Sequence, residues 1–366
     1  MSRALAHAER VAWIRLARTP RVGALTFHRL IARCKTAAGA LDFLGEGRHD
    51  AVPPPIDAVE RELEQLDALG ARALCAIEDD YPSGLKALAA PPPVIAARGD
   101  ARLFGKPLVA LVGAREASAA GLMLAETLAR DLGRLGYVVV SGLARGIDAA
   151  AHRATIETGA IAVLAGGLDK PYPPQNLALH ETIAARGCVV SEAPLGAVAR
   201  ARDFPRRNHI ISGLSLGVVV IEAALRSGSL ITARAAADQG REVFAVPGSP
   251  LDPRAQGGNA LLKQGATLVE TAEDVAAVLG APRRIAPAPP LAALWDDDAA
   301  PPRGLAAEIA VLLSPTPVHL NDLARAANAS PGAVAAALTD LELSGRAASL
   351  PGGYAASPGA AFPASR

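Results

Sequence analysis

Two apolar runs separated by one amphipathic segment constrain the fold of this chain more than any other feature. Leu108–Val112 contains no polar residue, and Tyr137–Val140 is a second run of the same kind. Runs this short and this apolar are typical of strands buried on both faces of a parallel sheet. Between them, Ser118–Leu135 has leucines at helical spacing and is followed by Gly136, which predicts an amphipathic helix. A strand, a helix and a second buried strand form a right-handed βαβ unit.

The same alternation of apolar runs and helical segments continues to residue 279. It predicts an α/β fold with an extended Rossmann-like, doubly wound and mostly parallel sheet. The expected strands are Leu108–Val112, Tyr137–Val140, Ile161–Leu164, Cys188–Ser191, Gly217–Ile221, Glu242–Val246 and Thr267–Val269. The expected helices are Ser118–Leu135, Ile147–Glu157, Asn176–Ala185, Ser229–Gln239, Asn259–Lys263 and Ala272–Leu279. Ligands of such sheets bind at the carboxyl ends of the strands, so the loops after the strands hold the candidate functional residues.

Helical segments on both sides of this region predict two smaller domains. Residues 1–52 contain three short helices, and a Pro-Arg-Val-Gly turn joins the first two. Residues 56–280 are assigned to the Rossmann-like domain, and the Ala/Pro-rich segment 281–304 to a linker. Residues 305–358 show three helical segments followed by a hairpin pattern, which describes a winged helix.

Composition and charge exclude several classes of protein. The 366 residues are 51% hydrophobic with a net charge of +1, so any nucleic-acid binding must come from a local basic patch. Three separated cysteines and seven scattered histidines predict neither a disulfide framework nor a metal site. The N-terminus carries charges throughout, and the longest uncharged apolar run, residues 210–221, is too short to span a bilayer. We therefore expect a cytoplasmic protein without a membrane segment.

Two turns that open helices predict anion binding at one edge of the sheet. Gly113–Arg115 follows the first strand and Ser141–Gly146 follows the second, and each combines glycine, small residues and one arginine. Backbone N–H groups at the start of a helix, together with a guanidinium, favour a phosphate. Ser229 and Thr232, at the start of a later helix, can cap that helix or contact a phosphate, and capping is the commoner role.

A group of arginines around one aromatic ring is the strongest basic feature of the chain. It lies in the loop predicted over 192–208 and consists of Arg200, Arg202, Phe204, Arg206, Arg207 and Asn208. Guanidinium groups can hold the phosphates of a single strand while the ring stacks on a base. The other interpretation is a solvated loop whose arginines pair with neighbouring carboxylates. The two arginine-bearing turns on the same edge favour the first interpretation, with Tyr172 as a second candidate stacking ring.

Two enzyme motifs do not support catalysis, because one is incomplete and the other lies in the wrong place. The first turn lacks the G-x-G-x-x-G pattern and no acidic residue ends the second strand, so a dinucleotide site is not expected. A G-x-S-x-G string occurs at 213–217, but it precedes a strand instead of following one. Ser215 is therefore interpreted as a turn residue and not as a nucleophile.

Taken together, these loops resemble those of the DprA/Smf family, the DNA-processing proteins of natural transformation. The matching segments run in family order and are Val112–Arg115, Ser141–His152, Tyr172–Asn176, Ser191–Glu192, Phe204–Asn208, Ser227–Ala233, Val246–Gly248 and Gly258–Asn259. The flanking segments resemble the family's helical N-terminal domain, of the SAM or helix-hairpin-helix type, and its C-terminal winged helix. Two positions depart from the family pattern. Ala114 replaces a usual Ser, and His209 replaces a usual Arg, which would make binding mildly pH-sensitive.

The resemblance implies a single-stranded DNA-binding recombination mediator that protects incoming DNA and helps load RecA during natural transformation. It also implies a homodimer formed through the Rossmann-like domain, with single-stranded DNA-binding protein as a further partner. It implies no catalysis, no cofactor and no metal. By matching position, Arg115 and Phe204–Asn208 would contact the DNA. With the turns and rings above, the predicted DNA-binding residues are Gly113, Arg115, Ser141, Gly142, Arg145, Tyr172, Gln175, Arg202, Phe204, Arg206, Arg207, Asn208, Ser229 and Thr232.

Two other functions stay open at this point. A nucleotide phosphoribohydrolase of the lysine decarboxylase-like family has the same kind of sheet, but the Glu of its Pro-Gly-Gly-x-Gly-Thr-x-x-Glu motif is missing after Arg226–Leu230. A scaffold that binds no nucleic acid would require the arginine loop to be fully paired internally. In the winged helix, Ser330–Leu343 carries only Asp340 and Glu342 as charges. We therefore expect this domain to mediate protein contact or regulation and not to bind duplex DNA.

Overall fold

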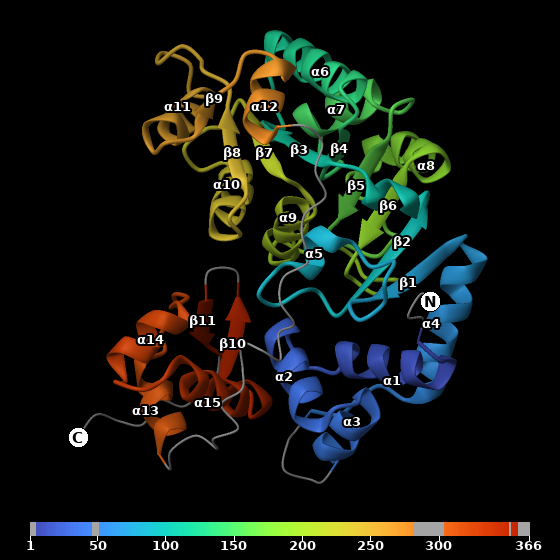
Figure 1. Ribbon diagram of the computed structural model, residues 1–366, viewed down its shortest axis with the longest axis vertical. Helices are drawn as coiled ribbons and strands as arrows, with labels where there is room; N and C mark the ends of the chain where they lie inside the picture. Colours follow the sequence, from blue (N-terminus) through green and yellow to red (C-terminus); the bar gives the residue numbers. More distant parts are fainter. Residues whose placement is uncertain (1–4, 46–50, 281–303, 351–352, 358–366) are drawn as a thin grey trace.

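The structure, a computed structural model, describes residues 5–45, 51–280, 304–350 and 353–357 (Figure 1). Within these residues a nine-stranded sheet has the order β1-β2-β6-β5-β4-β3-β7-β8-β9. The strands are β1 (Ala71–Cys75), β2 (Val94–Gly99), β3 (Leu108–Gly113), β4 (Val138–Ser141), β5 (Ala160–Leu164), β6 (Cys188–Ser191), β7 (Gly217–Ile221), β8 (Glu242–Ala245) and β9 (Thr267–Leu268). Strands β3 to β9 pair in parallel, whereas β1 and β2 add an antiparallel edge. The predicted Rossmann-like, mostly parallel sheet is confirmed.

The helices that follow the first strand cover the two faces of this sheet. They are α5 (Ser83–Lys86), the 3₁₀ helix η1 (Ala101–Gly105), α6 (Ala119–Arg134), α7 (Ile147–Ala154), the 3₁₀ helix η2 (Pro174–Asn176), α8 (Leu177–Arg186), α9 (Asp203–Leu214), α10 (Gly228–Asp238), α11 (Gln256–Lys263) and α12 (Ala272–Leu279). The sequence does not predict α9, because Pro205 and Gly213 normally interrupt helices. Pro205 is tolerated in the first turn, where its missing N–H would have no partner within the helix. The prediction of a loop over 192–208 is therefore wrong for residues 203–208, which belong to α9.

Alternating residues of the central strands pack into two hydrophobic layers. Val109, Leu111 and Val139 lie in one layer with residues of α6, α7 and α12. Ala110 and Val112 lie in the other layer with residues of α8, α9 and α10. These strand residues are at most 4% exposed, which explains why their sequence shows no polar alternation.

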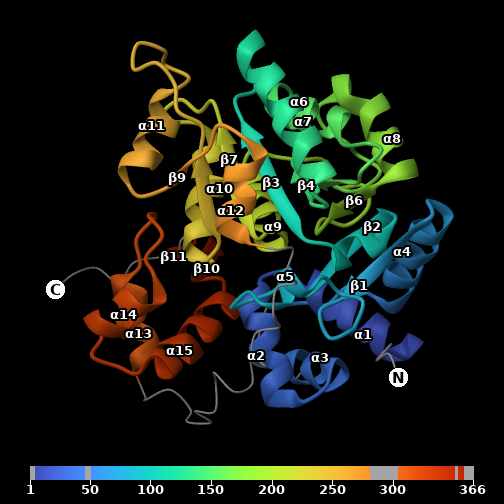
Figure 2. The same cartoon turned by 45° about the horizontal axis from the view of Figure 1, so that its top comes forward.

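The N-terminal helices α1 (His7–Arg18), α2 (Ala24–Cys34), α3 (Ala37–Gly45) and α4 (Ile56–Ala68) pack beside the β1 edge of the sheet. The C-terminal domain has the expected winged-helix elements, namely α13 (Leu305–Leu312), α14 (Leu320–Ala326), α15 (Pro331–Leu343), β10 (Ala347–Leu350) and β11 (Gly353–Ala356). Figures 1 and 2 both show α15 beside α2. The linker predicted over 281–304 lies outside the described residues, apart from its last position. No helix in the described ranges has the length and apolar character needed to cross a membrane.

The order of the strands reverses between β3 and β7, because β4 lies on one side of β3 and β7 lies on the other. In open α/β sheets the crevice at such a reversal, at the carboxyl ends of the strands, is the usual ligand site. Gly113 ends β3 at this crevice, and a Cβ there would lie 1.9 Å from the carbonyl oxygen of Ile221. The missing side chain therefore lets the ends of β3 and β7 approach, and Arg115 and Glu222 follow directly after them.

Candidate nucleic-acid interface

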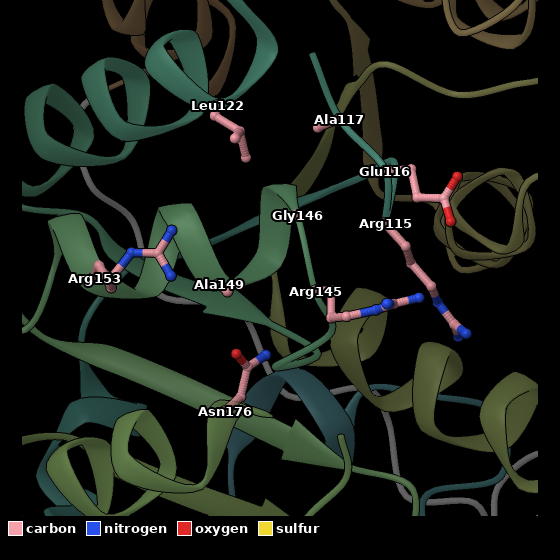
Figure 3. A pocket seen from close by; sticks show the side chains of 9 residues that line it. All are labelled: Arg115, Glu116, Ala117, Leu122, Arg145, Gly146, Ala149, Arg153 and Asn176. Carbon is pink, nitrogen blue, oxygen red and sulfur yellow. The ribbon is translucent and has the colours of Figure 1, made fainter. Parts of the chain in front are cut away.

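Two arginines without carboxylate partners lie at the carboxyl ends of β3 and β4. Arg115 follows β3 and Arg145 follows β4, both are exposed, and neither forms an ion pair with any residue that the structure describes. With Glu116, Arg153 and Asn176 they line a hollow of about 250 Å³ (Figure 3). In the figure the Arg145 side chain extends toward Arg115. Three arginines against one glutamate give the lining a net positive charge, so this hollow favours an anion.

Two aromatic rings stand close to this hollow. Phe204 is half-buried, and the guanidinium carbons of Arg115 and Arg207 lie 5.3 and 5.7 Å from the centre of its ring. Tyr172 packs edge-to-face on Phe204 with 6.1 Å between ring centroids, and it is 53% exposed. Because two guanidinium groups already lie against Phe204, Tyr172 is the more accessible ring for a nucleic-acid base. Tyr172 is therefore the first candidate for base stacking, whereas the sequence predicted Phe204 as the first and Tyr172 as the second.

Arg207, predicted as a cationic clamp on DNA, is buried beneath the second turn. It is 6% exposed, and its Nη1 donates to the carbonyl of Gly142 and, at 3.1 Å, to that of Val163. Gly142 leaves room for this guanidinium, because a Cβ there would lie 1.7 Å from Nη1 of Arg207. The predicted contact with DNA is therefore corrected: α9 directs Arg207 inward, where it holds backbone carbonyls.

The same turn also contains a buried carboxylate. Asp148, in the first turn of α7, accepts hydrogen bonds from the backbone N–H groups of Gly142 and Ala144 at 3.1 and 3.3 Å. Burial raises the pKa of Asp148 and lowers the pKa of Arg207 to about 10, and the opposite charge of each group counteracts the shift of the other. The carboxylate of Asp148 thus occupies the predicted phosphate site in the Ser141–Gly146 backbone. The group of this turn that remains accessible to a ligand is the exposed side chain of Arg145.

The first turn is filled in the same way by a residue that follows β7. Glu222 accepts hydrogen bonds from the backbone N–H of Ser118, at 2.8 Å, and from the hydroxyl of the same residue. Its carboxylate also lies within 3 Å of where a Cβ on Gly121, in the first turn of α6, would be placed. Helix N-termini favour anions, and this one holds the protein's own carboxylate. The prediction of a phosphate after β3 is therefore corrected at the start of α6, where Glu222 occupies the position that an anion would take.

Four other predicted residues are buried; they are Ser141, Asn208, Ser229 and Thr232. The Ser141 hydroxyl donates to the carbonyl of Leu111 at 2.6 Å, and the Asn208 amide donates to that of Gly228 at 3.2 Å. The Ser229 hydroxyl lies 2.7 Å from that of Ser227, which caps α10. These side chains hold the loops in place and do not reach a ligand at the surface.

The remaining arginines of the predicted cluster are exposed. Arg206 lies 2.8 Å from Glu192, and Arg202 lies 3.9 Å from Asp203. Arg200 forms no side-chain ion pair with a described residue. The side chains of Arg206 and Arg202 are 62% and 77% exposed, so a phosphate can approach both guanidinium groups. The scaffold interpretation requires every arginine of the cluster to be paired internally, and Arg200 does not meet this requirement within the described residues.

Gln175 is exposed and precedes Asn176, which lines the hollow and whose amide donates to the carbonyl of Leu143 at 2.8 Å. His209 is held by the amide of Gln239 at 2.8 Å, and burial lowers its pKa. This imidazole is therefore neutral at pH 7, and the predicted pH sensitivity of binding does not extend to that pH.

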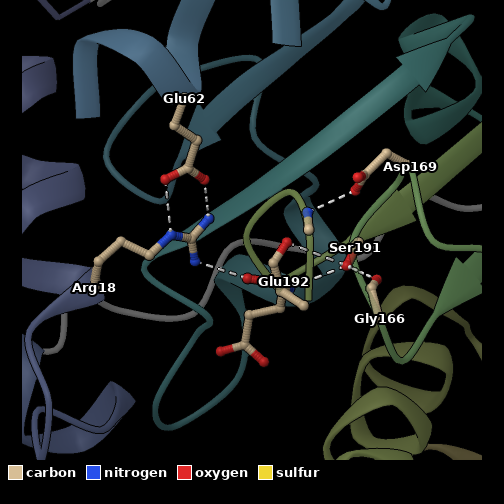
Figure 4. Close-up of polar contacts among 8 residues, drawn as sticks. Arg18, Glu62, Gly166, Asp169, Ser191 and Glu192 are labelled. Carbon is tan, nitrogen blue, oxygen red and sulfur yellow. Dashed lines mark hydrogen bonds and ion pairs between the residues drawn. The ribbon is translucent and has the colours of Figure 1, made fainter. Parts of the chain in front are cut away.

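The segment that leads from β6 into the arginine cluster is anchored at its base (Figure 4). The Ser191 hydroxyl donates to the carbonyl of Gly166 at 2.7 Å. Arg18, at the end of α1, donates to the carbonyl of Glu192 at 2.8 Å and pairs with Glu62 of α4 at 2.8 Å. The N-terminal helices therefore help to fix the start of this segment.

Sequence reasoning missed two features of the site. Arg153 lines the hollow from α7, and the signal for it was its spacing of four from Ala149, which places both on one helix face beside Gly146. Glu222 blocks the first turn, and no local pattern could show this, because its partner Ser118 lies 104 positions earlier in the chain.

Comparison with protein-family models matches three parts of the chain. Residues 72–280 match the model described as DNA recombination-mediator protein A. Residues 7–64 match the DprA-like N-terminal HHH domain, and residues 287–353 match the DprA winged helix domain.

Individual proteins and solved structures give the same result. The chain is 41% identical over 232 residues to DNA processing protein DprA of Bacillus subtilis (60% of this chain, 78% of that protein). It is 37% identical over 307 residues to protein Smf of Escherichia coli (82% of this chain, 81% of that protein). The DprA structure from Streptococcus pneumoniae matches with a TM-score of 0.63 and 31% identity, over 75% of this chain and 98% of that one. A structure of DprA from Helicobacter pylori, described as showing its single-stranded DNA binding mode, matches with a TM-score of 0.53 and 29% identity, over 57% of this chain and 95% of that one.

Proposed function

Since this chain belongs to the DprA/Smf family of DNA recombination mediators, we propose that it binds single-stranded DNA at Arg115, Arg145 and Tyr172, a surface we call the arginine rim. The proposal rests on the combination of two exposed arginines and an exposed aromatic ring. Neither arginine has a carboxylate partner among the described residues. The guanidinium groups hold phosphates, and the Tyr172 ring stacks on a base. Stacking on a ring requires an unpaired base, which favours a single strand over a duplex.

Three further residues extend the rim. Phosphates of the bound strand replace Asp203 beside Arg202 and Glu192 beside Arg206. Gln175 is exposed next to Asn176, which lines the hollow. Gly113 and Gly142 contribute by having no side chain: Gly113 leaves space for the carbonyl of Ile221, and Gly142 leaves space for the guanidinium of Arg207. Phe204 supports Tyr172 and Arg115 from below.

Fluorescence anisotropy with a labelled oligo-dT and with a duplex of equal length, each at two salt concentrations, tests the proposal. We expect tighter binding of the single strand and a steep loss of affinity with salt, because bound phosphates release counterions. Tighter binding of the duplex, or binding that does not change with salt, would contradict the proposal.

Family membership supports the same partners as the resemblance implied. The chain would protect incoming single strands, help to load RecA in the presence of single-stranded DNA-binding protein, and act as a cytoplasmic homodimer during natural transformation. A RecA nucleation assay on DNA coated with single-stranded DNA-binding protein tests the loading step, and light scattering tests the dimer. Unchanged RecA nucleation on addition of the protein would remove the mediator role.

The alternative of a phosphoribohydrolase is not favoured by the corresponding turn. Ser227 caps α10 there, and the helix continues with Ala233–Ala235, which offers no carboxylate. We propose that the protein performs no bond chemistry. Release of a free base from a nucleoside monophosphate would show that this is wrong.

A further inference from the structure

Helix α15 of the winged helix is in direct contact with α2 of the N-terminal domain. The Thr26 hydroxyl on α2 donates a hydrogen bond to the carboxylate of Glu342 on α15. One turn further along α2, Arg29 donates to the hydroxyl of Thr339 at 2.5 Å. In a winged helix of the DNA-reading type, the helix in this position enters the major groove. Here it is engaged by another part of the same chain (Figure 2).

The contact is built from apolar as well as polar groups. Leu343 is 1% exposed and belongs to the hydrophobic cluster of the N-terminal domain and sheet, not to that of the winged helix. In return, Leu25 of α2 packs against the winged-helix cluster. Thr339, Glu342 and Leu343 are spaced by three and four positions, so they occupy one face of α15. This face is therefore an interface between domains.

Glu342 brings a negative charge into this interface at a position suited to an anion. The residue is 4% exposed, and its surroundings on α2 are the Thr26 hydroxyl and the Arg29 guanidinium. Arg21, in the turn before α2, lies close enough that a Cβ on Gly345 would meet its guanidinium carbon at 2.8 Å. Two guanidinium groups and a hydroxyl on the N-terminal domain thus lie beneath the winged helix. Burying a carboxylate costs free energy. The Thr26 hydroxyl and the Arg29 guanidinium lower that cost, because both favour the charged form of Glu342.

We propose that the winged helix is a latch over an anion-binding face of the N-terminal domain, formed by Arg21, Thr26 and Arg29, and that Glu342 occupies the position of a nucleic-acid phosphate. A nucleic-acid strand and the winged helix then compete for this face. The latch is separate from the arginine rim, because its residues lie on α2, in the turn before α2 and on α15, whereas the rim follows β3, β4 and β5.

The test releases the latch without altering the anion-binding face. Leu343→Ser removes the apolar contact and leaves Glu342 and the three α2-side residues intact. Leu350→Ser, at a position 43% exposed on β10, is the matched control. Both are made in full-length protein that also carries Arg115→Gln and Arg145→Gln, so that the rim contributes little to binding. Hydrogen exchange reports release, and anisotropy with oligo-dT and with a duplex over several salt concentrations reports binding.

We expect Leu343→Ser, but not Leu350→Ser, to raise hydrogen exchange in α2 and α15 while α13 and α14 keep their protection. The released protein should bind nucleic acid at least threefold more tightly, with a salt dependence steeper by about 0.7–0.9, as for one added phosphate contact. Adding Arg29→Gln to the released protein should abolish the gain. Release without a gain in affinity, or a gain that survives Arg29→Gln, would overturn the proposal.

Glu342→Lys is the second variant, because Leu343→Ser could unfold the winged helix, which would show as lost protection in α13. The lysine repels Arg29, so it should release the latch and give the same gain. Unchanged exchange in α2 for both variants would also overturn the proposal. The rim itself is measured separately in the otherwise unaltered chain, so failure of the latch and failure of the rim are distinguishable.

Discussion

Arg207 and Arg115 are both predicted to contact DNA, but we expect replacement of Arg207 to lower the stability of the fold and replacement of Arg115 to weaken DNA binding. Arg207 is buried, faces Asp148, and donates to the carbonyls of Gly142 and Val163. Arg207→Gln leaves the aspartate charge without its counterpart and removes donors from both carbonyls. Leaving a buried acceptor without its donor costs about 1–3 kcal/mol. We therefore expect this variant to lose that much unfolding free energy in urea denaturation.

Arg115→Gln should behave in the opposite way. Arg115 is exposed and has no carboxylate partner in the described residues, so its unfolding free energy should change by less than about 0.5 kcal/mol. Its loss removes one phosphate contact, which should lower the slope of log K against log salt by about 0.7 for a single strand. Arg207→Gln, measured at a temperature where it is folded, should keep the slope of the unaltered protein.

Arg134→Gln is the control for both variants, because Arg134 is exposed on α6 and, among the residues described, forms an ion pair only with Asp131, three positions away. It should change neither stability nor slope. The reasoning is refuted if Arg207→Gln is as stable as the control and flattens the salt slope. That result would mean that the guanidinium leaves its buried position to contact phosphate.

Three further predictions follow from the same geometry. Tyr172→Ala should weaken oligo-dT binding by about 1–3 kcal/mol, the loss of one stacked base, with an unchanged salt slope in anisotropy; a changed slope would contradict a stacking role. Gly142→Ala should destabilise the protein by about 1–3 kcal/mol in urea denaturation, because its Cβ would lie 1.7 Å from the buried Arg207 nitrogen; unchanged stability would show that the guanidinium can move aside. Burial raises the pKa of Glu342 above its usual 4.5, so the docked state binds the proton more tightly than the released state. Docking of the winged helix should therefore be strongest below that pH and weaken as pH rises from 4.5 through the raised pKa, as followed by hydrogen exchange in α2, and Glu342→Gln should remove this dependence.

The sequence was sufficient to predict the sheet because each strand carries its own signal. Cys188–Ser191 and Gly217–Ile221 are buried on both faces, so their apolar runs have the same bounds as β6 and β7. Helix α9 carries a weaker local signal. Its first turn contains Pro205, and its buried face includes Arg207 and Asn208, so neither composition nor periodicity separates it from a basic loop.

The site was predicted less completely, because the direction of a side chain depends on distant residues. Glycine, small residues and arginine at the start of a helix are the pattern of a phosphate turn. In this protein Asp148 accepts from backbone N–H groups of the second turn, and Glu222 accepts from the N–H of Ser118 at the start of the helix after the first turn. Arg115 and Arg145 remain candidates for anion binding because both are exposed and neither forms an ion pair with a described residue.

The salt dependence of oligo-dT binding by the double variant Arg115→Gln/Arg145→Gln tests the central claim most directly. If these two side chains hold phosphates of a single strand, the slope of log K against log salt should fall by about 1.4, or 0.7 for each contact. Urea denaturation should show that the variant is as stable as the unaltered protein, because both residues are exposed. A slope equal to that of the unaltered protein would contradict the account, since the arginine rim would then carry no phosphate contact.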